Sequence, residues 1–213
     1  MLTTTHDQGA VRVLRFNRPE TLNAFNGAMF DAVTEELLAA AENDAVKVLS
    51  ITGEGRAFSA GMDLADRPAK DPMPEHGFEG MFEAFIEFPE PILLAINGVG
   101  VGFGCTITGL ADLVFMAASA KLRCPFTALG LTAEAASTVT FPAMMGPQVA
   151  NWVLLSSEWL DAQTCKEYGL AFAVVADDVL MQRTMEPAQL LAAKPLASLI
   201  TAQEIRMPPP PHG

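Results

Sequence analysis

Apolar residues recur along the chain with the spacing of short strands that alternate with helices. Residues 10–17 mix apolar and cationic side chains in near alternation, as a half-exposed strand does, and residues 46–52 form a second such segment. Between them, the apolar residues of 27–43 follow helical spacing, and Asn26 can cap that helix. A strand, a helix and a strand in this order predict a parallel unit with a right-handed crossover.

The same alternation continues to the end of the chain. We expect further strands at residues 92–96, 112–116, 121–124 and 173–175, and further helices at residues 77–88, 102–110, 147–156, 161–167, 178–193 and 195–207. Asp161 is a candidate N-cap and Gly169 a candidate stop for one of these helices, and the final PPPPHG can only be extended. With no internal repeat and no dividing linker, the chain is predicted to be α/β, with a core at residues 1–193.

Composition narrows the classes of ligand. Half of the 213 residues are apolar, which is enough for a sizeable core, and the formal charge is −12. No run of Lys or Arg exists, so nucleic acid is not expected as a partner. A phosphate-bearing ligand would have to be held by a few local cations or by backbone N–H groups.

The cysteines, the histidines and the hydropathy of the chain argue against disulfide-linked, metal-binding, histidine-dependent and membrane-spanning proteins. The three cysteines form no CxxC pair, which favours reduced thiols, and the N-terminus lacks a charged-then-apolar signal segment, so we expect a cytoplasmic protein. The histidines lie near the chain ends or in a loop, which leaves no base for a Ser-His-Asp or Cys-His nucleophile and no metal site. The uncharged stretch 93–111 is long enough to span a membrane, but its glycines and Asn-Gly turn favour a buried strand and helix.

Two glycine-containing turns are candidate ligand sites. The segment FSAGMDL, residues 58–64, follows a strand, and its free N–H groups could bind negative charge; an ordinary strand-to-helix turn with Asp63 in the first helical turn explains it equally well. The segment NGVGVGFG, residues 97–104, allows close backbone approach, to a ligand or to a packed helix. It fits neither a dinucleotide-binding fingerprint nor a P-loop.

Glu134 is the third candidate. It is the only charged residue between Arg123 and Glu158, and it lies in the apolar segment LGLTAEAASTVTF. Burial of a carboxylate raises its pKa toward values suited to a general base. The alternative is a surface acid at a helix start capped by Thr132, and these residues alone do not separate the two.

Taken together and in this order, the segments resemble the crotonase superfamily of enoyl-CoA hydratases and isomerases. The resemblance runs from about residue 11 to residue 193 and includes NRPETLNAFN, GRAFSAGMDL, INGVGVGFGCTITGLADLVFMA, CPFTALGLTAEAASTVTFP and LDAQTCKEYGLA. It implies a crotonase-type spiral of ββα units, acyl-CoA thioester substrates and a place in fatty-acid β-oxidation. It implies no separate cofactor, since coenzyme A is part of the substrate.

The resemblance also implies roles for individual residues. The two backbone N–H groups that polarise the thioester carbonyl would be those of Met62 and Phe103. Substrate contacts are implied at Leu22, Ala60, Gly61, Asp63, Leu64 and Gly102. Arg18 and Arg56 flank the matching loops and are candidates to hold coenzyme A phosphates, although solvated surface charge explains both as well.

Departures from the hydratase pattern favour the isomerase branch of this superfamily. Hydratases that resemble this chain use two glutamates, and the matching positions here are Thr106 and Phe126, neither of which moves a proton at neutral pH. Glu134 matches the single glutamate of the Δ3–Δ2 enoyl-CoA isomerases. We therefore expect an isomerase that shifts a 3-enoyl-CoA double bond to 2-enoyl-CoA. Another crotonase reaction such as hydration, or a non-catalytic acyl-CoA-binding paralogue, stays open.

The C-terminal segment bears on assembly. Relative to the family, residues 194–213 are expected to be a truncated helical segment and a Pro-rich tail. Crotonase-like chains are trimers or pairs of trimers, and a single spiral would expose apolar residues such as Val149, Trp152 and Val153. A homotrimer or hexamer is the expected assembly.

Overall fold

The computed structural model describes residues 1–64 and 73–206. The strands are β1 (Thr3–Gln8), β2 (Val11–Phe16), β3 (Val48–Gly53), β4 (Ala57–Ser59), β5 (Ile92–Ile96), β6 (Val99–Val101), β7 (Leu113–Ala117), β8 (Lys121–Arg123), β9 (Trp159–Asp161) and β10 (Ala173–Val175). The α-helices are α1 (Gly27–Ala41), α2 (Gly77–Glu87), α3 (Phe103–Thr106), α4 (Ser137–Met145), α5 (Pro147–Ser156), α6 (Ala162–Tyr168), α7 (Leu180–Ala192) and α8 (Leu196–Arg206). Short 3-10 turns are η1 (Pro19–Thr21), η2 (Ile107–Leu110), η3 (Thr127–Leu129) and η4 (Asp177–Val179).

Two sheets form a spiral. The larger has the order β1-β2-β3-β5-β7-β10 and the smaller has the order β4-β6-β8-β9. In three successive steps, a strand of the larger sheet is followed after a short turn by a strand of the smaller one: β3 then β4, β5 then β6, and β7 then β8. Pairings from β2 to β10 in the larger sheet are parallel, and β1 joins antiparallel at the edge. The predicted α/β class is confirmed.

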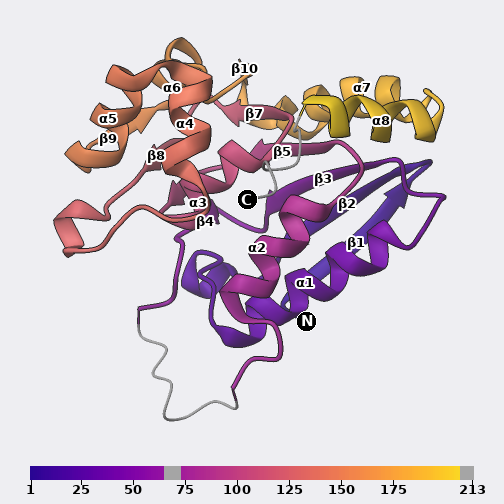
Figure 1. Ribbon diagram of the computed structural model, residues 1–213, viewed down its shortest axis with the longest axis horizontal. Helices are drawn as coiled ribbons and strands as arrows, with labels where there is room; N and C mark the ends of the chain where they lie inside the picture. The colour runs from indigo at the N-terminus through magenta and orange to yellow at the C-terminus, as the bar shows by residue number, and fades with distance from the viewer. Residues whose placement is uncertain (65–72, 207–213) are drawn as a thin grey trace, which may run out of the picture.

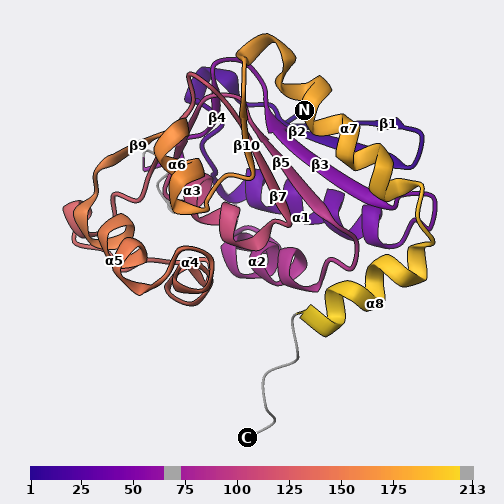
Figure 2. The ribbon, with the colours of Figure 1, turned by 90° about the horizontal axis from the view of Figure 1, so that it is seen from above.

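Helices cover both faces of the larger sheet (Figures 1 and 2). Helix α7 packs on β2, β3, β5 and β7, and α1 with α2 lies on the opposite face (Figure 2). Burial on both faces explains why β3 and β5 are buried throughout, which is typical of parallel strands. The smaller sheet extends away from this layer, together with α4, α5 and α6 (Figure 1).

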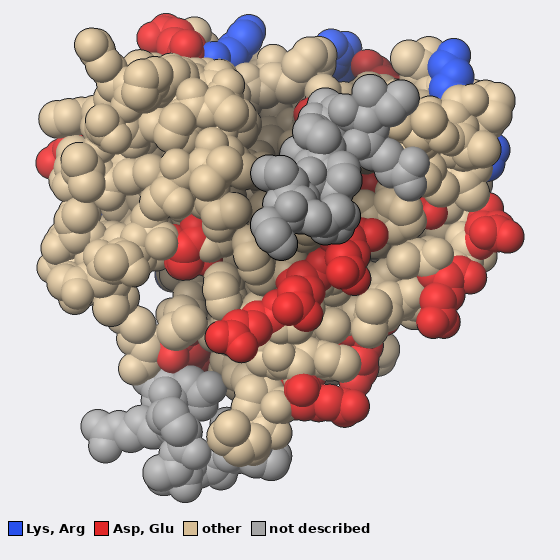
Figure 3. All heavy atoms as spheres, in the orientation of Figure 1, with Lys and Arg blue, Asp and Glu red and all other residues tan. Residues whose placement is uncertain are grey.

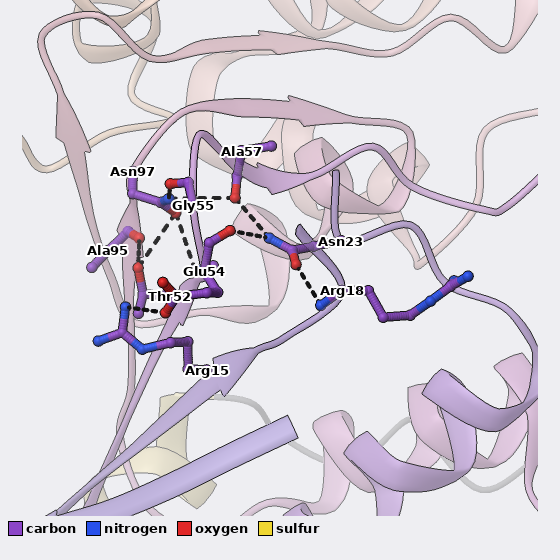
Figure 4. A network of polar contacts seen from close by, with 10 residues as sticks. Arg15, Arg18, Asn23, Thr52, Glu54, Gly55, Ala57, Ala95 and Asn97 are labelled. Carbon is purple, nitrogen blue, oxygen red and sulfur yellow. Dashed lines mark hydrogen bonds and ion pairs between the residues drawn. The ribbon is translucent and has the colours of Figure 1, made fainter. Parts of the chain in front are cut away.

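A buried amide network holds the two sheets together where the chain crosses between them (Figure 4). The Asn23 amide donates to the carbonyls of Glu54 and Ala57 at 3.0 and 2.8 Å, and its oxygen accepts from the Arg18 N–H at 2.9 Å. The Asn97 amide donates to the Gly55 carbonyl at 2.9 Å. Both asparagines therefore hold the backbone of the turn between β3 and β4, and the Asn23 amide satisfies the carbonyl of buried Ala57.

Most predicted elements are confirmed, including both caps. The Asn26 side chain accepts from the Met29 N–H, the Asp161 side chain accepts from the Thr164 N–H, and Gly169 ends α6 in the left-handed region. The uncharged stretch 93–111 folds into β5, β6, α3 and η2, and no helix of the described residues could span a membrane. The expected extended tail PPPPHG lies outside the described residues.

Four strands and one α-helix were not predicted. Strand β1 is polar and forms at the edge by pairing with β2, and β4, β6 and β9 are three-residue strands that form by pairing within the smaller sheet. Helix α4 contains Pro142 and several β-branched residues, which have low helix propensity, and it is held by packing on α5 and η2. The expected helix at 102–110 is one α-helical turn followed by a 3-10 turn.

The apolar surface of α5 differs from the expectation. Trp152 is 53% exposed, as expected, but Val153 is buried and Val149 is half-buried against the core. Residues 149, 152 and 153 share one helical face, and α5 packs part of that face against α4 and η3.

Candidate active site

A cavity of about 380 Å³ opens between the two glycine-containing turns and the segment that carries Glu134. Most of the side chains that line it are apolar, and α1 and α2 contribute Phe30 and Phe78. The full lining is Phe30, Ala60, Met62, Leu64, Phe78, Val101, Gly102, Phe103, Pro125, Phe126, Leu129, Leu131, Thr132 and Glu134. A cavity this apolar suits an acyl group, with a few polar groups to orient it.

The first turn leaves one N–H group without an internal acceptor. Gly61 has φ +79°, and a Cβ there would lie 2.4 Å from the Val101 carbonyl oxygen. Met62 forms a bridge with Phe25, in which the Phe25 N–H donates to the Gly61 carbonyl and the Asp63 N–H donates to the Phe25 carbonyl. The bridge uses the backbone groups on either side of Met62, so the Met62 N–H has no acceptor among the described residues.

The second glycine-containing turn also leaves an N–H group without an acceptor, at the start of α3. Gly102 has φ +55°, and Phe103 is the first residue of the helix, where backbone N–H groups lack an intrahelical acceptor. The N–H groups of Cys105 and Thr106 bond to the Gly102 carbonyl, whereas the Phe103 N–H has no acceptor in the described part of the chain. Met62 and Phe103 both line the cavity, and each has a backbone N–H group without an acceptor among the described residues.

Glu134 is the only ionisable residue among those that line the cavity. Its Oε1 accepts a hydrogen bond from the Thr106 hydroxyl at 2.6 Å, while its Oε2 is buried and has no partner among the described residues. Burial raises the pKa of Glu134, and the Thr106 hydrogen bond opposes part of that rise. A carboxylate with one free oxygen and a raised pKa suits proton transfer.

The backbone around Glu134 is strained. Ala135 and Ala136 follow it with φ of 51° and 53°, which L residues other than glycine, asparagine and aspartate rarely adopt. The Glu134 carbonyl accepts from both the Ser137 N–H at 3.0 Å and the Ser137 hydroxyl at 2.6 Å. These contacts fix the direction in which the Glu134 side chain leaves the backbone.

Comparison with known proteins identifies the family. The model of the enoyl-CoA hydratase/isomerase family matches residues 6–208. The chain belongs to that family. It is 33% identical to the 1,2-epoxyphenylacetyl-CoA isomerase of Escherichia coli (strain K12), over 92% of this chain and 78% of that protein. It is 29% identical to the enoyl-CoA delta isomerase 2 of Homo sapiens over 96% of this chain, and it spans about half of that protein, 53%.

A solved structure confirms the crotonase fold for this family member. The enoyl-CoA hydratase EchA8_6 of Mycobacterium marinum superposes with a TM-score of 0.93 at 43% identity, covering 98% of this chain and 100% of that chain. The spiral predicted from the resemblance is therefore correct. The family acts on acyl-CoA thioesters, so this member is an acyl-CoA enzyme, and its cavity is the candidate active site.

The structure brings together most of the residues predicted for an enoyl-CoA hydratase/isomerase site. Ala60, Met62, Leu64, Gly102, Phe103 and Glu134 all line the cavity. Leu22, Gly61 and Asp63 are not among the lining residues. The Leu22 carbonyl accepts from the Ala60 N–H, and the Gly61 carbonyl accepts from the Phe25 N–H, so in this structure both hold the loop that carries Met62.

The two candidate cations have different environments. Arg18 is not a solvated surface charge: its guanidinium donates to Asp63 at 3.1 Å and to the Ala24 carbonyl at 2.6 Å, and its side chain is 13% exposed. Arg56 is exposed. Thr132 lines the cavity and does not cap a helix, because α4 begins at Ser137 with Ala136 as its N-cap.

Sequence reasoning missed the aromatic wall and the polar partner of the glutamate. Phe30 and Phe78 meet edge to face at 5.8 Å, and Phe78 meets Phe103 in the same way at 5.8 Å. Thr106 was considered only as a missing acid, yet it contacts Glu134. No sequence pattern links residues 28 positions apart; only the fold places them together. No group of His, Cys, Asp or Glu within the described ranges could hold a metal ion.

Proposed function

We propose that this protein shifts the double bond of a 3-enoyl-CoA thioester into conjugation, giving a 2-enoyl-CoA. Glu134 takes the proton from C2, the electrons pass to the thioester oxygen, and the same carboxyl returns the proton at C4. The N–H groups of Met62 and Phe103 hold the oxygen while it is negative. The observation that carries the proposal is the single carboxyl group in an apolar cavity that also presents two unsatisfied N–H donors.

The two N–H donors and the general base together could supply a large rate enhancement. Each preorganised donor to an oxyanion is typically worth about 3–4 kcal/mol in the transition state. A positioned general base contributes about 10²–10⁴-fold. Both effects are strengthened in a cavity lined almost wholly by apolar side chains, because few dipoles compete there.

Hydration is the alternative reaction. The two-glutamate mechanism needs a second acid, and Thr106 and Phe126 stand at the positions where hydratases carry their acids. Similarity to the human enoyl-CoA delta isomerase 2 supports isomerisation, whereas similarity to the Mycobacterium marinum enoyl-CoA hydratase keeps hydration as a candidate. A protein that binds acyl-CoA without converting it is the remaining possibility.

One pair of variants tests the proposal. Glu134→Gln keeps the shape of the cavity and removes the base, so it should lower isomerisation of 3-enoyl-CoA by at least about 10²-fold and leave acyl-CoA affinity nearly unchanged. Glu90→Gln is the matched control, because Glu90 is also a buried glutamate but lines a separate, smaller cavity. The appearance of the conjugated thioester is followed by its ultraviolet absorbance.

The outcomes separate the three candidates. Isomerisation that survives Glu134→Gln would remove Glu134 as the base. Hydration of 2-enoyl-CoA by the native protein, without isomerisation, would establish the hydratase. Binding of acyl-CoA with neither reaction would establish the silent paralogue.

We extend the proposal to ligand contacts, assembly and compartment. Coenzyme A enters as part of the substrate, and exposed Arg56 is the better remaining candidate for its phosphates, since Arg18 is held by Asp63. The exposed side chains of Val139, Trp152 and Leu155 favour a homotrimer or hexamer, which light scattering at micromolar concentration checks. The free, buried cysteines suit a reducing compartment such as the cytoplasm.

A further inference from the structure

The hydroxyl of Thr106 has three acceptors within reach and a single proton to donate. Glu134 Oε1 lies at 2.6 Å, the Gly102 carbonyl at 3.3 Å and the Phe103 carbonyl at 3.5 Å. Hydrogen bonds to an ionised carboxylate are shorter and stronger than bonds to a neutral carbonyl. The proton therefore goes to Glu134 whenever that carboxyl is ionised.

We propose that Thr106 is a positioning residue that occupies Oε1 of Glu134 and leaves Oε2 as the only oxygen that takes and returns the substrate proton. The inference rests on the proposed function, because it assigns Thr106 a role in the reaction of that same carboxyl group. It also gives a purpose to the residue that replaces a hydratase acid. A threonine there cannot move a proton, but it fixes the group that does.

The burial of Thr106 and of Glu134 Oε2 supports a role for Thr106 in positioning the Glu134 carboxyl group. Thr106 is fully buried, and Oε2 of Glu134 is buried without a partner, whereas Oε1 has one. The two oxygens of this carboxyl group therefore differ: Oε1 is held by a hydrogen bond and Oε2 is not. A base that acts from one defined position requires such a difference. The strained Ala135 and Ala136 hold the same side chain from the backbone.

Helix α3 links this contact to the oxyanion donors. It is a single turn that begins at Phe103, which lines the cavity, and ends at Thr106. A single rigid turn therefore sets both the place of one donor and the orientation of the base. The Thr106 hydrogen bond ties the Glu134 side chain, which comes from the irregular segment before α4, to the same turn that positions Phe103.

A simpler role for Thr106 is to hold its own helix. Buried threonines often donate to a carbonyl in the preceding turn, and Thr108 does so to Cys105 at 2.7 Å. Thr108 is equally buried and lies two residues further along, but its hydroxyl donates to the Cys105 carbonyl and not to Glu134. It supplies the matched control.

The experiment compares Thr106→Val, Thr106→Ser and Thr108→Val. The valine at 106 keeps the side-chain shape and removes the donor, so the pKa of Glu134 rises and the acid limb of the kcat/KM profile moves to higher pH, with about a ten-fold loss of kcat. The serine restores the hydroxyl and should return both quantities close to native. The valine at 108 should lower only the free energy of unfolding.

A second readout is independent of turnover. Carbon-13 NMR of glutamate carboxyl groups in the ligand-free protein, assigned with Glu134→Gln, measures the pKa of Glu134 directly. If the native protein shows no isomerisation, the proposed function fails, yet a higher pKa in Thr106→Val still establishes the positioning contact. Thr106→Ala replaces the valine variant if that one does not fold. An unchanged Glu134 pKa in the hydroxyl-free variant, or an equal shift in Thr108→Val, overturns the inference.

Discussion

Arg18 and Asp63 form a half-buried ion pair beside the Met62 N–H group. The Arg18 Nη2 lies 3.1 Å from Asp63 Oδ2, and the two side chains are 13% and 16% exposed. The Asp63 backbone N–H donates to the Phe25 carbonyl, so the residue after Met62 is held by both its backbone and its side chain. Two residues that were candidates for ligand contacts thus support a loop.

A double-mutant cycle measures what this pair contributes. Arg18→Ala, Asp63→Ala and the double variant should show a coupling of about 1–2 kcal/mol in the free energy of unfolding, since the pair is shielded from water. The control pair is Arg15 and Glu54, 3.3 Å apart but 30% and 47% exposed, where the coupling should stay below about 1 kcal/mol. Equal couplings in urea unfolding would contradict a supporting role.

The Met62 N–H group and the Met62 side chain can be tested separately. Met62→Pro deletes the N–H group and should lower kcat by at least about 10²-fold, whereas Met62→Ala should keep most of the activity. Circular dichroism checks that the proline variant is folded. A folded Met62→Pro protein with native kcat would reject the oxyanion assignment.

Glu90 predicts a dependence of stability on pH. Burial raises its pKa to about 7 from 4.5, so the native state holds a proton that the unfolded state has already released. The linkage relation then requires stability to fall as pH rises from about 4.5 to 7. Glu90→Gln should remove this decline and be more stable than native by about 2 kcal/mol at pH 8. Parallel stability–pH curves for the two proteins would disprove it.

The left-handed conformation of Ala136 predicts a stabilising glycine. Ala136→Gly relieves a backbone penalty of about 1–2 kcal/mol and adds unfolded-state entropy worth about 0.4–1 kcal/mol, so a net gain of about 0.5–1 kcal/mol is expected. Ala133 is the control, since it is not among the residues with positive φ. Ala133→Gly should destabilise, and thermal unfolding of both variants gives the sign directly.

Helix α2 carries an acidic row on its exposed face. Glu79, Glu83 and Glu87 are exposed and spaced four residues apart, and Figure 3 shows acidic side chains in a diagonal row across this face of the molecule. Like charges at this spacing repel, so Glu83→Lys replaces two repulsions with two attractions and should stabilise by about 0.5–1 kcal/mol. Glu83→Gln should gain about half. Both gains should vanish in 1 M salt, and persistence there would exclude the charge explanation.

The sequence by itself determined the elements with strong periodicity and the family. The helices with apolar stripes, the strands β3 and β5 and both side-chain caps follow from local spacing, because hydrophobic period and capping act over a few residues. The ordered motifs predicted that Glu134, Met62 and Phe103 belong to one site, and the three residues line the same cavity. The lone charge of Glu134 in an apolar segment left a buried base and a surface acid equally open, and in the structure partial burial raises the pKa of this carboxyl group.

Only the tertiary structure decided which of these residues meet and what each one contacts. The three-residue strands β4, β6 and β9, which the local sequence did not predict, form through hydrogen bonds to strands far away in the chain. From the sequence, Thr106 is only a residue in place of a hydratase acid, but in the fold its hydroxyl lies 2.6 Å from Glu134. Arg18 could equally be a surface charge from the sequence, but in the fold it forms an ion pair with Asp63. Periodicity reports which side of an element is buried, whereas the partner of a buried polar group depends on contacts between segments far apart in the chain.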